Sequence, residues 1–111
     1  MSSYASRRSE CPLNIALELL GDRWSLLIVR DLIFAGKTQY REFLESAEGI
    51  STNILADRLK RLEAHGLIEK TPYQPNPVRY DYNLTEKGRD LEPLVREIIR
   101  WGLKHIPGTG Y

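Results

Sequence analysis

One stretch of the sequence places polar side chains at the spacing of a helix face. At 100° per residue, Asn53, Ala56, Asp57 and Lys60 fall on one side of residues 51–64, and leucine and isoleucine fall on the other. Asparagine can pair with the edge of adenine and lysine with that of guanine, and a helix fits the major groove of DNA. This face predicts recognition of double-stranded DNA, with Asn53 and Lys60 reading bases.

The start of this predicted helix is suited to bind phosphate. Ser51 is a favourable N-cap residue, and Ser51 and Thr52 lie beside backbone N–H groups that have no partner within the helix. We expect both residues to contact DNA phosphates. Two interpretations of Asp57 remain open, since it can accept from a cytosine amine or pair with Lys60 or Arg61 on the surface. Arg61 is a further candidate DNA contact.

Two other arginines also have open assignments. Arg58 lies within the apolar arc of the same helix, where a buried ion pair and a phosphate contact are both consistent with its position. Arg79 follows a loop that Pro75 and Pro77 make rigid. Either it enters the minor groove of DNA, or it is a solvated hairpin residue.

Start and stop residues divide the chain into helices and a hairpin. In order, we expect a helix from Cys11-Pro12 to Gly21, a helix capped by Asp22 and ending near Gly36, a short helix over Tyr40 to Ala47, a helix from Ser51 to about Ala64, strands over 67–73 and 78–84 around the loop 74–77, and a helix from Thr85 to about Lys104 that bends at Pro93.

This order predicts a mainly α fold with a small β-hairpin. The third and fourth helices, joined by a glycine turn, form a helix-turn-helix, and the hairpin after them forms a wing. A chain of 111 residues is the size of one domain. We expect a flexible N-terminal arm over 1–10, a DNA-binding and dimerisation domain over 11–106 and a C-terminal tail over 107–111.

Composition argues against several other classes of protein. One cysteine and two distant histidines form no metal-ligand cluster, and no glycine-rich phosphate loop or nucleophile with an adjacent base occurs, so we expect no metal, no cofactor and no enzyme activity. Without a long apolar run or the apolar segment of a signal peptide, the protein should be cytoplasmic and away from membranes. A net charge of +1 is low for a nucleic-acid binder, so the placement of the basic side chains matters more than their total.

Short motifs in a fixed order over residues 11–102 resemble a known family. They are Cys11-Pro12, Ala16-Leu17, Gly21-Asp22-Arg23-Trp24, Leu27-Ile28, Gly49-Ile50-Ser51, Leu55, Arg58-Leu59, Leu62-Glu63, Gly66-Leu67-Ile68, Val78-Arg79-Tyr80 and Leu84-Thr85-Glu86-Lys87-Gly88. The set resembles the HxlR family of bacterial regulators, which implies a dimeric winged-helix protein that acts on operator DNA. Gln39 stands where that family usually has an arginine, so the phosphate contact of that arginine is removed, and Arg41 is the candidate to compensate. Gln39 itself remains among the candidate DNA-binding residues.

The last predicted helix carries more apolar surface than a small core needs. Its apolar side chains cover an arc of about 200° at 100° per residue, roughly twice what one side of a core requires. We therefore expect a two-fold symmetric homodimer whose interface includes Leu94, Val95, Ile98 and Trp101. The alternative is a helix buried within its own domain.

Cys11 is expected at the very start of the first helix, where the helix dipole lowers the pKa of a thiol. Some members of the resembling family sense oxidants or electrophiles through a cysteine at this position, which implies redox sensing by Cys11. The other interpretation is a small apolar residue packed beside the dimer interface.

Taken together, these expectations describe a sequence-specific transcriptional regulator that binds an inverted-repeat operator as a homodimer. The competing hypothesis is a winged-helix module that binds proteins or RNA without specific DNA binding, because a fold does not determine a function. The sequence identifies no small-molecule effector.

Overall fold

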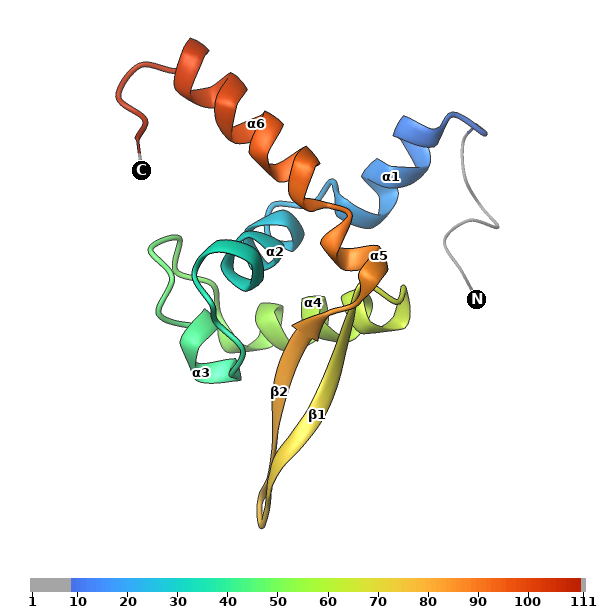
Figure 1. Cartoon of the computed structure of the whole chain (residues 1–111), viewed down its shortest axis with the longest axis vertical. Coiled ribbons are helices and arrows are strands. Elements are labelled where there is room, and N and C mark those ends of the chain that lie inside the picture. Colours follow the sequence, from blue (N-terminus) through green and yellow to red (C-terminus); the bar gives the residue numbers. More distant parts are fainter. Residues whose placement is uncertain (1–8, 111) are drawn as a thin grey trace.

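The computed structural model describes residues 9–110, so most of the expected N-terminal arm and the last residue of the tail lie outside the described residues. Figure 1 shows the helices α1 to α4, a two-stranded hairpin and the helices α5 and α6. Their bounds are α1 Pro12–Leu20, α2 Ser25–Phe34, α3 Tyr40–Phe43, α4 Thr52–Ala64, β1 Ile68–Pro75, β2 Val78–Leu84, α5 Glu86–Arg89 and α6 Glu92–His105. This is the expected helix-turn-helix followed by a wing.

The first two helices begin and end where local chemistry predicts. Pro12 occupies the first position of α1, and the N–H of Gly21 donates to the carbonyl of Leu17 at 2.7 Å to close its last turn. The carboxylate of Asp22 accepts from the backbone N–H groups of Trp24 and Ser25 at 3.0 and 3.1 Å. Asp22 therefore accepts from the N-cap residue and from the first residue of α2, but the N-cap position itself is occupied by Trp24 and not, as the sequence predicted, by Asp22.

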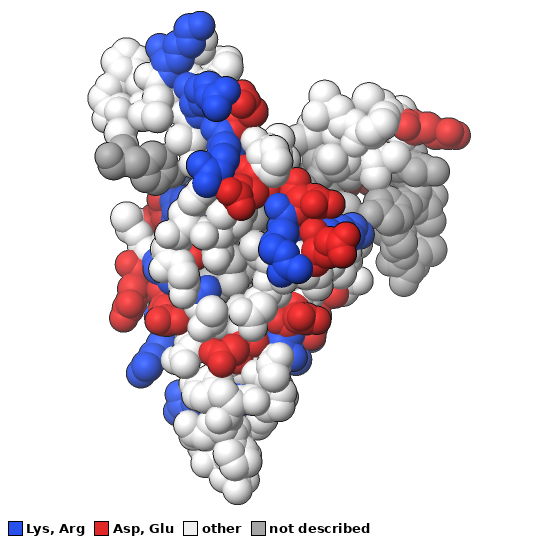
Figure 2. Space-filling view, in the orientation of Figure 1, with Lys and Arg blue, Asp and Glu red and all other residues white. Residues whose placement is uncertain are grey.

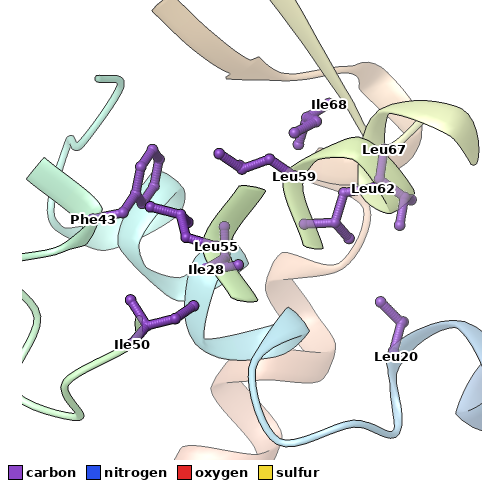
Figure 3. Packing of buried hydrophobic residues seen from close by; sticks show 9 residues of the cluster. All are labelled: Leu20, Ile28, Phe43, Ile50, Leu55, Leu59, Leu62, Leu67 and Ile68. Carbon is purple, nitrogen blue, oxygen red and sulfur yellow. The ribbon is translucent and has the colours of Figure 1, made fainter. Parts of the chain in front are cut away.

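The hydrophobic core lies between α2, α3, α4 and the base of the wing (Figure 3). Its buried members are Leu20, Ile28, Phe43, Ile50, Leu55, Leu59, Leu62, Leu67 and Ile68. The ring of Phe43 meets Tyr82 of β2 edge to face, with centroids 6.4 Å apart. The core thus joins the helix-turn-helix to the wing, because α4 supplies three of its leucines and β2 packs against α3.

The wing is longer than the sequence predicted. Pairing of β1 with β2 continues from Ile68↔Leu84 to Pro75↔Val78, with a register irregularity between Pro72 and Gln74. Only residues 76 and 77 remain outside the strands, so the expected four-residue loop is wrong. Both strands of a two-stranded sheet are edges, where proline is tolerated because one side of the backbone needs no partner.

Two expected helices differ from those observed. The third ends at Phe43 and not at Ala47, because the chain turns through hydrogen bonds from Ser46 N to Phe43 O at 3.3 Å and from Gly49 N to Ser46 O at 3.0 Å. The single bent helix after Thr85 is two helices, α5 and α6. Pro93 lies in the first turn of α6, where its missing N–H is harmless, and not at a bend inside one helix.

The fold has two ends that differ in character. The wing projects at one end, while α1 and α6 diverge from each other at the opposite end (Figure 1). In the part of the chain that the structure describes, no helix is long and apolar enough to cross a bilayer.

Candidate nucleic-acid interface

Helix α4 turns one polar face to solvent, as its sequence pattern predicted. Leu55 and Leu59 are 0% and 3% exposed, so this side of the helix belongs to the core. The exposed side carries Ser51, Thr52, Asn53, Ala56, Asp57 and Lys60. Within residues 9–110, Asn53 and Lys60 make no side-chain hydrogen bond or ion pair. Their donors and acceptors are therefore available to an external partner.

The first turn of α4 is held by a side-chain cap and by α3. Ser51 Oγ accepts from the backbone N–H of Ile54 at 3.3 Å, so Ser51 is the N-cap residue that the sequence predicted. The hydroxyl of Tyr40 donates to the carbonyl of Thr52 at 2.6 Å. This contact fastens α3 to the start of α4, where residues 51–53 are exposed. The uncapped N–H groups of a helix start can bind an anion.

Arg58 forms a partly buried ion pair between α4 and the start of α2. Its Nε donates to Asp22 Oδ2 at 2.8 Å, and the two side chains are 22% and 19% exposed. Partial burial opposes ionisation, but hydrogen bonds from Ser25 and Arg58 outweigh it and lower the pKa of Asp22 to about 2. Of the two interpretations of Arg58, the structure supports the ion pair, and its guanidinium orients α4 on α2.

Asp57 pairs with a different residue from those expected. Its carboxylate accepts from the guanidinium of Arg58, the next residue along the chain, and not from Lys60 or Arg61. Arg58 pairs with both Asp22 and Asp57, and its side chain is 22% exposed. Lys60 and Arg61 therefore keep their charges free of Asp57.

Three further candidate DNA contacts come together where α3 meets the wing. Gln39 and Arg41 at the start of α3 and Arg79 of β2 line one hollow of 260 Å³, together with Tyr73 and Val78. Arg41 and Arg79 are exposed, and Gln39 is half-buried. The structure thus places two cations beside the site of the missing family arginine, one from α3 and one from the wing.

The contacts that hold the wing against α3 were missed by sequence reasoning. The N–H of Tyr82 donates to the carbonyl of Thr38 at 2.7 Å, and the hydroxyl of Thr38 donates to Asp81 at 3.2 Å. Glu42 accepts from the N–H groups of Gln39 and Thr38 at 2.9 and 3.0 Å, which lowers the pKa of its carboxyl. Because Thr38 and Asp81 are distant in sequence, no local pattern indicates that they meet.

The wing tip carries little charge. Between residues 71 and 79, Arg79 is the only basic residue, and exposed Tyr73 and Val78 lie nearby. Figure 2 shows the far end of the wing as mostly uncharged surface. Lys70, nearer the base, lies 4.6 Å from the ring centre of Tyr80. The basic side chains on this side of the molecule therefore lie mainly at the base of the wing and on α3 and α4.

The opposite end of the molecule exposes apolar side chains on α6. Leu94, Ile98 and Trp101 are 43%, 50% and 61% exposed. Val95 differs from the prediction, since it is only 5% exposed and is packed within its own chain. On the neighbouring α1, Leu13 and Leu17 are 66% and 54% exposed.

Cys11 is exposed and is the N-cap residue of α1, as the sequence predicted. Hydrogen bonds from the backbone of Asn14 and Leu13 lower the pKa of its thiol. This favours the thiolate, which is the reactive form of cysteine.

Comparison with known proteins gives one consistent result. The HxlR-like helix-turn-helix family matches residues 19–109. An uncharacterised HTH-type transcriptional regulator of Synechocystis is 38% identical over 92 residues, which is 83% of this chain and 67% of the relative. A similar regulator of Mycobacterium bovis is 39% identical over 92 residues, and the chain spans 57% of its length.

Solved structures agree with this assignment. A putative transcription factor, PA1607, has a TM-score of 0.81 at 40% identity, over 94% of this chain and 72% of its own. The oxidised form of the redox regulator HypR has a TM-score of 0.76 at 33% identity, over 86% and 97%. The winged fold expected from the sequence is confirmed, and the chain belongs to the HxlR-like helix-turn-helix family of transcriptional regulators.

Proposed function

We propose that this regulator binds an operator in double-stranded DNA as a homodimer. The observation that supports this proposal most directly is the exposed polar face of α4. The Arg58–Asp22 ion pair and the Tyr40–Thr52 hydrogen bond hold this helix on the core. Two such helices, related by a two-fold axis, enter successive major grooves about 34 Å apart and read the halves of an inverted repeat.

Each candidate residue has a role that follows from its chemistry and position. Asn53 and Lys60 read base edges, and Asp57 and Arg61 flank them on α4. Phosphate contacts come from the start of α4, through Ser51 and Thr52, and from the junction of α3 with the wing, through Gln39, Arg41 and Arg79. Backbone contacts set the register, while the two base contacts supply the sequence preference.

The homodimer is supported by the exposed apolar side chains at the end of the molecule away from the wing. Leu94, Ile98 and Trp101 of α6, with Leu13 and Leu17 of α1, form a surface that a single chain leaves in water. Pairing these surfaces across a two-fold axis buries them.

Selection of bound duplexes from a random pool tests the DNA-binding proposal, and an inverted repeat is the expected product. On that operator, Asn53→Ala and Lys60→Ala should each weaken binding by about 1 to 3 kcal/mol, because each removes a base contact. Lys104→Ala on α6 is the matched control, since it removes one positive charge far from the wing and should leave affinity unchanged. Unchanged affinity for both α4 variants would refute the assignment of the reading face.

A protein-binding winged-helix module is the second candidate, and the uncharged wing tip is the observation that favours it. Salt dependence separates the two hypotheses. Duplex binding through several phosphates weakens steeply as salt rises, whereas an apolar protein interface does not weaken in this way. If no duplex is enriched from the random pool, and the protein binds a protein partner with an affinity that does not depend on salt, this alternative is favoured.

We also propose that modification of Cys11 changes operator affinity. Support comes from the exposed, activated thiol and from the similarity to HypR, which is a redox regulator. With one cysteine per chain, a disulfide forms only with a small thiol or with Cys11 of the second chain. Operator binding is compared before and after diamide treatment, for wild type and Cys11→Ser. Equal responses from the two proteins would contradict this role.

A further inference from the structure

A groove of about 620 Å³ lies between α2 and α6, and none of its lining residues belongs to the surfaces proposed above for DNA binding or for the dimer. Its apolar walls are Phe34 and Ala35 at the end of α2 and Ile99 and Leu103 of α6. The volume falls within the range of about 300 to 1,000 Å³ that is typical of small-molecule sites, which are mostly apolar with a few convergent polar groups.

The groove faces away from the apolar surface proposed for the dimer. At 100° per residue, Leu103 lies about 140° around α6 from Ile98 and about 160° from Trp101. A second chain packed on Ile98 and Trp101 therefore covers the other side of α6. Contacts of a second chain with Ile98 and Trp101 would therefore leave Leu103 and the groove uncovered.

Two arginines of α6 at the rim can accept an anion. Arg96 lies 4.8 Å from the ring centre of Phe34 and pairs with Glu92 at 2.8 Å, and Arg100 pairs with Glu97 at 2.7 Å. The two arginine side chains are 58% and 74% exposed. Exposed pairs of this kind are weak, so a carboxylate positioned by an apolar body can replace them.

A third arginine connects the groove to the helix-turn-helix. Arg30 lines the groove and donates from Nη1 and Nη2 to the two carboxylate oxygens of Glu48 at 2.8 and 2.9 Å. Glu48 lies in the turn between α3 and α4. The neighbouring Asp31 also lines the groove, and it accepts from Ser46 of the same turn. A change at the groove therefore reaches the segment that positions α4.

We propose that the α2–α6 groove binds a small amphipathic carboxylate, with its apolar body between Phe34 and Leu103 and its carboxylate on Arg96 and Arg100. The bound carboxylate also attracts Arg30, whose guanidinium pairs with both Glu48 and Asp31, and competes with these two carboxylates, so occupancy alters operator affinity. This second step rests on the proposed DNA-binding function, whereas binding of the ligand does not.

Calorimetric titration with decanoate and with decylammonium tests the site, because the two probes share an apolar chain and differ in charge. We expect one decanoate site per chain and at least tenfold weaker binding of decylammonium. Arg100→Gln should weaken decanoate about tenfold, as expected for one lost charged hydrogen bond, while Lys104→Gln, one turn away with the same loss of charge, should not. Leu103→Glu should abolish binding.

Three results would overturn the proposal. Equal binding of the two probes, or binding that survives Leu103→Glu, would indicate general adsorption to apolar surface. If Leu103→Glu sediments as a monomer while the wild type is a dimer, the groove is part of the dimer interface and not a ligand site.

The regulatory step is measured as operator affinity with and without decanoate. Decanoate should change the affinity of the wild type severalfold and leave that of Glu48→Gln unaltered. No effect on the wild type would refute the coupling. If the protein binds no duplex even without decanoate, the DNA-binding proposal fails. The calorimetric titration still shows whether the groove binds a carboxylate.

Discussion

Gly88 should be intolerant of any side chain, because it packs against the backbone at the base of the wing. It lies in α5, and the hydroxyl of Thr85 accepts from its N–H at 3.1 Å. A Cβ at this position would overlap the carbonyl oxygen of Leu67 and lie 2.9 Å from Cδ2 of Leu84. The Leu67 carbonyl cannot move away easily, since it accepts from the N–H of Thr85 at 3.1 Å.

The magnitude follows from this rigidity. Overpacking of a well-packed site costs about 1 to 3 kcal/mol, and a clash with hydrogen-bonded backbone belongs at the upper end. We expect Gly88→Ala to lower the free energy of unfolding by about 3 kcal/mol, which is a large part of the roughly 5 to 15 kcal/mol of a typical domain. For a chain of this size the melting temperature should fall by about 10 to 20 °C.

Thermal and urea unfolding, followed by circular dichroism, measure this effect. Gly102→Ala in α6 is the matched control, because the nearest atom to its Cβ, other than its helix's own backbone, is Ile106 Cδ1 at 3.9 Å. That change should stabilise the chain by about 0.5 to 1 kcal/mol, as alanine replaces glycine inside a helix. If the melting temperature of Gly88→Ala stays within a few degrees of wild type, the packing argument at α5 is wrong.

Two further predictions concern the ion pair and the dimer. Asp22 has a pKa lowered to about 2, so its contribution of about 1 to 2 kcal/mol is present at neutral pH and is lost as pH falls from about 4 towards 2. Asp22→Asn should remove this part of the acid sensitivity in urea unfolding between pH 7 and 2, and an unchanged pH profile would contradict it. Ile98→Asp should place a charge in the apolar surface of α6 and give a monomer in sedimentation, with Lys104→Asp as the exposed control on the same helix. If Ile98→Asp remains a dimer, the dimer interface does not include this surface of α6.

Local chemistry made several features predictable from the sequence. Pro12 and Gly21 mark the two ends of α1, and Ser51 marks the start of α4. The helical spacing of apolar residues such as Leu55 and Leu59 orients α4 on the core. Each of these signals acts within one or two helical turns. The helix-turn-helix, the wing and the exposed face of α4 were therefore predictable without tertiary information.

Contacts between distant segments were decided only by the tertiary structure. The residue type of Arg58 is consistent with an ion pair or with a phosphate contact. The approach of Asp22, from the turn between α1 and α2, determined that the ion pair formed. Val95 and Ile98 are equally apolar, yet one is buried and the other exposed, because α2 packs on only one side of α6. Periodicity reports how much apolar surface a helix carries, whereas the position of its neighbours determines which part of that surface remains in water.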